Sequence, residues 1–147
     1  MSLPGIEPDL PTVRAKLACI DTTLAFFRLV DNGLAAQAAE LFTDDGRLTA
    51  AGNSVVGKPA LRTAMQARQD NVERRTAHLV ATPTCELISP TEARTEALLQ
   101  FYLLAEQPAD GSASPNALTR VRDRLVRGPD GRWLIAERVL TLLAGKV

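Results

Sequence analysis

The stretch Ala117–Leu143, ALTRVRDRLVRGPDGRWLIAERVLTLL, predicts two long strands joined by a short turn. The four residues GPDG at 128–131 are typical of a hairpin turn between two strands. We therefore expect antiparallel strands over 117–127 and 132–143. The other predicted elements all lie upstream of this hairpin in the chain.

Further strands are expected upstream of the hairpin. The residues change to strand character at about 74, with runs over 74–81 and 84–88 that end at the turn SPT, 89–91. A long strand is expected next, over 92–104. A loop rich in Pro, Gly and Ser, 105–116, then separates that strand from the hairpin. The second half of the chain thus predicts a largely antiparallel sheet.

The first half of the chain predicts three helices. From Pro11 onward, apolar residues recur at three- and four-residue steps and define one helical face: Val13, Leu17, Ile20, Leu24 and Phe27. A second, short helix is expected over 34–42. A third begins at 57–59, after a short strand over 47–50, and has proline in its first turn. Helices followed by strands predict an α+β domain, with three N-terminal helices packed on one face of a curved sheet.

Length and composition fit one domain with its own core. The chain has 147 residues, 46% of them hydrophobic, and its 17 basic and 17 acidic residues give no net charge. No basic excess points to nucleic acid, and the apolar runs are far too short to cross a membrane. The N-terminus lacks the pattern of a signal peptide. We therefore expect a cytoplasmic protein with a flexible arm over 1–10 and a single domain over 11–147.

Cysteine and histidine usage bears on cofactors. Cys19 and Cys85 lie in separate predicted elements, without a CxxC motif or a nearby histidine, and are interpreted as two small buried hydrophobic residues. A single histidine without a cluster of cysteine or acidic residues does not favour a metal site. We expect no metal and no other cofactor.

Four segments in a fixed order carry a resemblance to a known family. They are LFTDDGRL, VVGKPAL, RTAHLV and RLVRGPDGRWLIAERV. With them the chain resembles the SnoaL-like group of the nuclear-transport-factor-2-like superfamily over Val13–Leu142. The resemblance implies a cone-shaped barrel, in which a strongly curved mixed or antiparallel sheet wraps around a long helix and encloses a pocket. It also implies a homodimer through the sheet, because members of the group are often dimers of that kind.

The resemblance leaves the function open. The group includes ketosteroid isomerases, scytalone-type dehydratases, polyketide cyclases and the non-catalytic small subunits of ring-hydroxylating dioxygenases. It therefore implies either a cofactor-free enzyme or a module that binds a ligand without changing it. The residues expected in the pocket bear on that choice.

His78 is the only histidine of the chain and lies inside a predicted strand. Histidine has an unperturbed pKa close to neutrality, so His78 is the first candidate for proton transfer. Strand alternation places Thr76 and Val80 on the same face, where we expect them to contact a ligand together with Phe27. In scytalone-dehydratase-like proteins a histidine at the matching place acts in proton transfer. The alternative is a pocket or core histidine that bonds a neighbour and does no chemistry.

Asp31 stands at the end of the first predicted helix, before Asn32 and Gly33. The resemblance implies that an aspartate near this place supports the histidine. However, Val30 stands where the dehydratases have a tyrosine, so a hydroxyl group is missing. The residues themselves favour a turn, in which the Asp31 side chain bonds local backbone N–H groups.

Asp123 is an acidic residue on the apolar face of its strand, between Val121 and Leu125. An acid in such a place needs a partner or a raised pKa. Our first interpretation is a structural ion pair with Arg138 of the last strand, a residue that SnoaL-like sequences also carry. The second is a pocket acid that works with His78. The register of the hairpin decides between them, and the sequence does not fix it.

The enzyme hypothesis combines these residues around a small hydrophobic carbonyl compound. His78 would move a proton, Asp31 or Asp123 would orient it, and Tyr102 or Arg138 would stabilise the developing oxyanion. Isomerisation, dehydration and aldol-type cyclisation share this step, and none needs a cofactor.

The competing hypothesis is a non-catalytic ligand-binding module or an accessory subunit. Two features favour it: the missing tyrosine beside Asp31, and the small number of polar groups expected to face inward.

Overall fold

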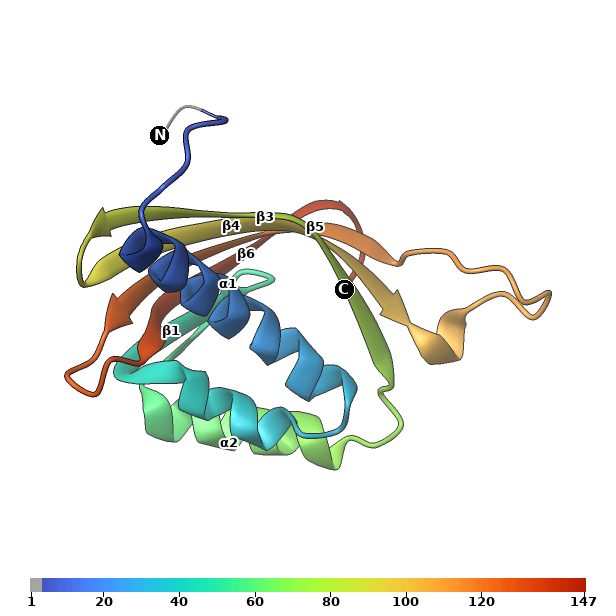
Figure 1. The fold of residues 1–147 in the computed structure, drawn as a ribbon. Coiled ribbons are helices and arrows are strands. Elements are labelled where there is room, and N and C mark those ends of the chain that lie inside the picture. Colours follow the sequence, from blue (N-terminus) through green and yellow to red (C-terminus); the bar gives the residue numbers. More distant parts are fainter. Residues whose placement is uncertain (1–3) are drawn as a thin grey trace.

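One mixed sheet of six strands dominates the computed structural model, which describes residues 4–147. Figure 1 shows the sheet curving over α1, with η1 and α2 below it. The elements in chain order are α1 (Leu10–Asp31), the 3-10 helix η1 (Ala35–Leu41), β1 (Phe42–Ala50), β2 (Asn53–Val56), α2 (Lys58–Asp70), β3 (Thr76–Ser89), β4 (Glu92–Leu103), the 3-10 helix η2 (Leu104–Glu106), β5 (Ala117–Arg127) and β6 (Trp133–Gly145). The predicted α+β class, with three N-terminal helices on a curved sheet, is confirmed.

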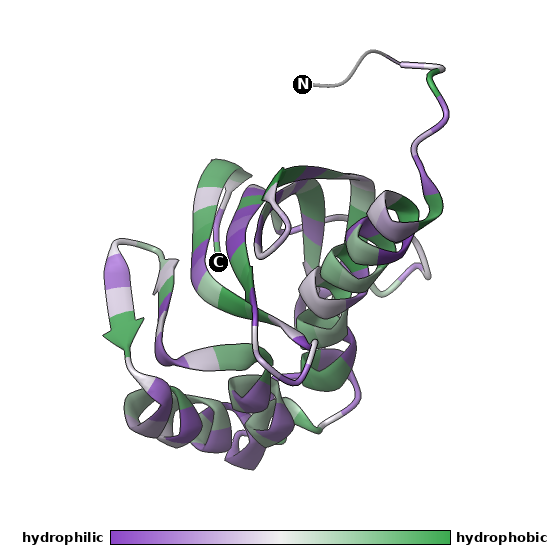
Figure 2. Cartoon of the chain, turned by 60° about the vertical axis from the view of Figure 1, so that its left-hand side comes forward, coloured by the Kyte–Doolittle hydropathy of each residue, from purple (hydrophilic) through white to green (hydrophobic). Residues whose placement is uncertain are grey.

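The strands follow the order β2-β1-β6-β5-β4-β3. The β1–β6 pair is parallel, and the other neighbouring pairs are antiparallel. Hydrophilic and hydrophobic bands alternate along the strands (Figure 2), which is typical of a sheet with one face on the core and the other in water. The predicted hairpin is β5 and β6, and Arg127 and Trp133 are the first partners beyond its turn.

The predicted run over 74–81 and its continuation over 84–88 form one strand, β3, which a bulge bends without ending it. At this bulge the pairing with β4 shifts between Ala81 and Thr84, and Thr82 has a φ of 51°. β1 starts five residues earlier than predicted, at Phe42 rather than at Arg47. The short strand β2, which pairs with β1, is missing from the prediction.

α1 turns a different face toward the sheet from the predicted one. Its buried residues are Cys19, Thr23, Phe26, Phe27 and Val30. Leu17, which was expected on the inner face, is 62% exposed. The prediction was wrong there because apolar spacing alone does not fix the rotation of a helix, and here the small side chains of Cys19 and Thr23 face the sheet. Residues 1–3 of the expected arm lie outside the described residues.

The second expected helix is a 3-10 helix that packs on α2. Its residues Ala35, Ala38 and Ala39 are fully buried, so the backbones of η1 and α2 approach closely. The Gln69 side chain of α2 accepts a hydrogen bond from the Ala36 N–H at 3.0 Å, which satisfies one of the unpaired donors at the start of η1. Together these segments close the lower side of the fold.

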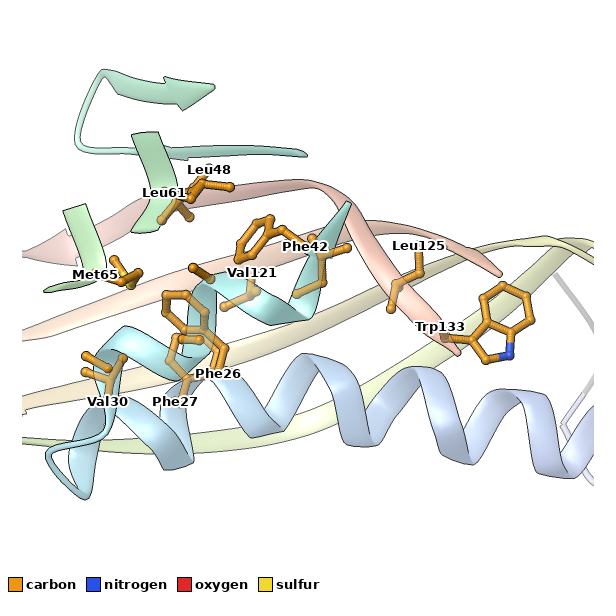
Figure 3. Close-up of a cluster of buried hydrophobic side chains, with 14 of the residues drawn as sticks. Phe26, Phe27, Val30, Phe42, Leu48, Leu61, Met65, Val121, Leu125 and Trp133 are labelled. Atoms are coloured by element: carbon orange, nitrogen blue, oxygen red, sulfur yellow. The ribbon is translucent and has the colours of Figure 1, made fainter. Parts of the chain in front are cut away.

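The hydrophobic core lies between α1 and the inner face of the sheet (Figure 3). Phe26 contacts Phe27 and Phe42 edge to face, with ring centroids 5.3 and 6.1 Å apart. Leu125 and Trp133 extend the cluster from the C-terminal part of α1, where Phe26 and Phe27 lie, toward its N-terminal part. Aromatic pairs of this geometry stabilise a core beyond the area that they bury.

A buried ion pair crosses the inner face of the sheet. Arg138 of β6 donates from Nε and Nη2 to the two carboxylate oxygens of Asp123 in β5, at 2.7 and 2.6 Å, and neither side chain is exposed. Thr23 of α1 donates its hydroxyl to Asp123 at 2.8 Å, and its backbone oxygen accepts from Arg138 at 2.9 Å. The structural pair, our first interpretation of Asp123, is thus confirmed.

The rings of Phe26 and Phe27 lie against the same guanidinium. Its carbon is 4.7 and 4.9 Å from their centroids, a distance suited to cation–π attraction. Nη1 of Arg138 is buried without a hydrogen-bond partner among residues 4–147. The contacts with the two rings therefore add to the hydrogen bonds that Nε and Nη2 make. The ion pair therefore also supports two aromatic side chains of α1.

Removal of one partner of this pair should destabilise the fold strongly. We expect Asp123→Leu to lower the free energy of unfolding by about 3–5 kcal/mol, because it leaves the Arg138 charge buried without a counterion. Glu96→Gln removes an exposed partner of Arg122 on the neighbouring strand and should cost less than about 1 kcal/mol. Urea unfolding of both variants checks this. Equal losses would show that the buried pair is no more important than the exposed one.

Candidate functional site

A cavity of about 280 Å³ opens between the C-terminal half of α1, the end of α2 and the inner face of β3–β6. Its walls are mainly apolar, with Phe26, Phe27, Val30, Met65, Leu99, Phe101, Leu140 and Leu142 among its lining residues. Five polar side chains join them: Arg68, Arg74, Thr76, His78 and Thr119. An apolar cavity with a few polar groups is the usual form of a small-molecule site.

His78 and Asp31 form a hydrogen-bonded pair beside this cavity. His78 Nδ1 lies 2.6 Å from Asp31 Oδ1, and the His78 backbone N–H donates to Oδ2 at 2.8 Å. The Thr76 hydroxyl also donates to Oδ1, at 2.9 Å. The turn interpretation of Asp31 is therefore wrong, because its carboxylate bonds groups of β3 that lie more than 40 residues away in the chain. An interaction of this kind leaves no local signal in the sequence.

The contact with Asp31 sets the chemical state of the imidazole. An ionised carboxylate can only accept hydrogen bonds, so the neutral ring carries its proton on Nδ1. Nε2 is then the basic nitrogen, and it has no hydrogen-bond partner among the described residues. The ring contacts Phe27 and Phe101, whose centroids are 5.1 and 5.3 Å away. These contacts hold the plane of the imidazole in place.

Asp31 remains an anion in this setting. Burial alone would raise the pKa of Asp31, but the hydrogen bonds and positive charge of His78, together with the Thr76 hydroxyl, outweigh burial and hold the pKa below its ordinary value. The side chains of Asp31 and His78 are 21% and 12% exposed, so water has limited access to the pair. The arrangement suits a base that is oriented by a permanent negative charge.

Arg68 extends the hydrogen-bonded chain behind Asp31. Its Nη2 donates to the Thr76 hydroxyl at 3.1 Å and to the Arg74 backbone oxygen at 2.8 Å. Burial and the nearby charge of Arg74 lower the pKa of Arg68 from its ordinary value. The sequence predicts no functional role for Arg68, because nothing in the sequence places the end of α2 beside β3.

The other predicted site residues lie elsewhere. Tyr102 was expected to offer its hydroxyl to the pocket, but Phe101 takes the inner position and the Tyr102 hydroxyl donates to Gln100 at 3.2 Å. Val80 packs against the hydrophobic core instead of lining the cavity. Asp123 and Arg138 are occupied by each other, so neither carboxylate nor guanidinium reaches His78. Phe27 and Thr76, by contrast, line the cavity, and their contact with a ligand stays a prediction.

Cys19 and Cys85 lie together in the core rather than in a metal site. Cys19 is fully buried, Cys85 is half-buried, and both are free thiols. The hydrogen bond with Cys85 and burial raise the pKa of Cys19, so this thiol stays protonated. Within residues 4–147 no cluster of histidine, cysteine and acidic residues could hold a metal ion, and no helix there is long and apolar enough to cross a membrane.

A larger open hollow, of about 740 Å³, lies along β3–β6 and is lined mainly by side chains of the outer sheet face. Arg94, Glu96, Arg122, Arg124 and Glu137 are among the charged residues there. Glu96 pairs with Arg122 at 2.7 Å, and this contact is exposed to water. Most of the residues that line the hollow are charged and none is a histidine, so the smaller cavity at His78 is the better candidate site.

The whole-chain pattern matches one family. The family model of the SnoaL-like domain matches residues 11–139 of the chain. No curated protein matches the chain.

Several solved structures have a similar fold. A protein from Novosphingobium aromaticivorans, provisionally named a scytalone dehydratase, is 18% identical with a TM-score of 0.75, over 91% of this chain and 87% of that one. Another from the same organism, provisionally named an aromatic ring hydroxylase, is 19% identical with a TM-score of 0.73, over 90% and 91% of the two chains. A Mycobacterium tuberculosis protein of unknown function is 24% identical with a TM-score of 0.74, over 89% and 77%. At such identities the likeness shows a shared fold.

The lowered pKa of Asp31 predicts how the pair contributes to stability at different pH values. A carboxyl group whose pKa is depressed by folding stabilises the protein fully above its unfolded value, near 3.9, and this contribution is lost as the pH falls through the folded value. We expect Asp31→Asn to be about 1–3 kcal/mol less stable than the unmodified chain at pH 7, and the difference to shrink in acid. Unfolding free energies measured from pH 7 downward check this. Asp21→Asn, at an exposed position of the same helix, is the control, and an identical pH dependence in both variants would contradict the prediction.

Proposed function

Since the chain belongs to the SnoaL-like domain family, we propose that it binds a small hydrophobic carbonyl compound in the cavity and moves a proton through His78 without a cofactor. The observation that carries this proposal is the His78–Asp31 pair, because His78 lines a mainly apolar cavity and its Nε2 has no described hydrogen-bond partner. The fold shared with a protein provisionally named a scytalone dehydratase supports it. A buried, oriented histidine is a typical general base.

The proposed step is proton abstraction from a carbon next to the carbonyl group. Nε2 takes the proton, the C–H electron pair moves toward the carbonyl oxygen, and an enolate and an imidazolium form. Asp31 stabilises the imidazolium through Nδ1 while it remains ionised itself. The imidazolium can then return the proton to a different carbon, which is isomerisation, or to a departing hydroxyl, which is dehydration.

The cavity favours this step by its surroundings. Contacts with Phe27 and Phe101 and the bond to Asp31 hold the imidazole, so little reorganisation is needed when the ring becomes charged. The apolar walls keep water away from the enolate. Neither Tyr102 nor Arg138 lines the cavity, so the proposal gives them no part in stabilising the oxyanion.

A second candidate function is a ligand-binding module without catalysis, such as an accessory subunit. The observation that favours it is Val30, which lines the cavity where a tyrosine hydroxyl would be needed to polarise a carbonyl group. The fold shared with a protein provisionally named an aromatic ring hydroxylase is compatible with such a role. In this case His78 contacts the ligand but transfers no proton.

The single histidine permits a direct test of the proposal. Carbonyl compounds of steroid-like and polyketide-like type are added to ¹⁵N-labelled protein, and the ring nitrogens of His78 are followed by NMR. We expect a fixed Nδ1–H tautomer whose signals move when a compound binds. For a compound that is converted, His78→Gln should lower the turnover by at least about 10². Gln100→Ala, on the outer face beside Phe101, should leave turnover unchanged, whereas full turnover in His78→Gln would refute the catalytic role.

We also propose that two copies pair through the sheet, as the family resemblance implies. Light scattering of the purified chain should then give twice the monomer mass of 15.8 kDa. A stable homodimer without other subunits disfavours the accessory-subunit role. A monomer that associates only with a larger oxygenase subunit would support that role and contradict the homodimer.

A further inference from the structure

Two arginine side chains border the same cavity as His78. Arg68 comes from the last turn of α2, and Arg74 comes from the short segment between α2 and β3. Both are half-buried. A guanidinium remains charged at any pH a protein meets, so the cavity carries two permanent positive charges.

Neither guanidinium has a carboxylate partner among residues 4–147. Arg68 uses only Nη2, for the Thr76 hydroxyl and the Arg74 backbone oxygen, and its Nε and Nη1 have no described partner. Arg74 lies over the Phe101 ring at 5.6 Å and makes no described hydrogen bond with its side chain. Most of the five N–H donors of each guanidinium group therefore have no acceptor among the described residues.

The nearest acid does not neutralise these charges. Both oxygens of Asp31 are occupied, Oδ1 by the Thr76 hydroxyl and the His78 ring, and Oδ2 by the His78 N–H. Arg68 and Arg74 therefore bring two positive charges to the cavity, and neither forms an ion pair with Asp31. Burial and the proximity of Arg74 lower the pKa of Arg68, and the charge of Asp31, which acts in the opposite direction, does not outweigh them.

We propose that the ligand of this cavity is an apolar carbonyl compound that also carries a carboxylate, and that Arg74 and Arg68 bind this carboxylate. The inference rests on the proposed function, because it names the substrate class of the same site. A guanidinium matches a carboxylate in two parallel hydrogen bonds, which makes arginine the residue suited to recognise a planar acid.

Phe101 neighbours both the cation and the proposed base. Its ring centroid lies 5.6 Å from the guanidinium carbon of Arg74 and 5.3 Å from the centroid of the His78 ring. A ligand that contacts Phe101 can therefore direct its carboxylate to Arg74 and its reacting carbon to His78. A cavity of about 280 Å³ is at the small end of ligand sites, so it suits a ligand of one or two rings.

The test compares a carboxylate probe with a neutral probe of the same shape. 2-Naphthoate and 2-naphthamide are titrated into the full chain at neutral pH and low salt, and the dissociation constants are taken from the shifts of the His78 ring signals. We expect 2-naphthoate to bind at least about tenfold more tightly, and this preference to decrease as salt is added.

Neighbouring arginines provide matched variants. Arg74→Gln should weaken 2-naphthoate about tenfold and leave 2-naphthamide unchanged, and Arg74→Lys should restore part of the loss. Arg75→Gln removes the same charge at the next, exposed position and should change neither probe. Arg68→Gln should also weaken 2-naphthoate selectively.

The outcomes separate this inference from the proposed function. If both probes move the His78 signals with equal affinity, or if Arg75→Gln acts like Arg74→Gln, the carboxylate inference is wrong and the ligand cavity stands. If neither probe moves the His78 signals while the protein is folded, both the inference and the proposed binding of small apolar compounds fail.

Discussion

The buried contact between Asp123 and Arg138 is the constraint on which the arrangement of the other elements depends. Two charges taken out of water are tolerated only when good geometry and further hydrogen bonds satisfy them. Here the partners come from adjacent strands, and Thr23 of α1 bonds both of them. Thr95 of β4 adds a hydroxyl contact to Thr23 at 2.7 Å. Three strands and the long helix are thus held in one relative position by a single polar cluster.

This cluster reaches the candidate site through the periodicity of α1. Thr23, Phe27 and Asp31 are four residues apart, so they share one face of the helix. The first bonds the ion pair, the second packs against the His78 ring, and the third bonds its nitrogen. A rotation of α1 about its axis would disturb all three contacts together. The position of α1 therefore determines both the polar cluster in the core and the His78–Asp31 pair beside the cavity.

The sequence predicts the elements of this fold much better than the contacts between them. The hairpin turn at 128–131 and the acid on the inner face of its strand are local signals, but Arg138 is suggested as the partner of Asp123 by the family resemblance, and the register that pairs them comes from the structure. Asp31 looks like a turn residue because its partners are on β3, far along the chain. Strand alternation shows that Phe101 and Tyr102 face opposite sides, but not which of them faces inward.

The pair of arginines illustrates the same limit. Arg68 and Arg74 are six residues apart, and a helix end and a bend between them are needed to bring both to one cavity. No spacing rule predicts that arrangement. The charge total of the chain, which is zero, does not show it either, because a total carries no information about where two arginines gather.

β3 lies at the edge of the sheet, where only β4 pairs with it. Exposed edge strands offer unpaired N–H groups to which another polypeptide can add as a further strand. The N–H of His78 is such a group, and the Asp31 carboxylate occupies it at 2.8 Å. The residue that orients the histidine therefore also protects this edge against strand addition between molecules. The Asp31 side chain thus serves both the orientation of His78 and the resistance of this edge to aggregation. Selection for either property would preserve Asp31.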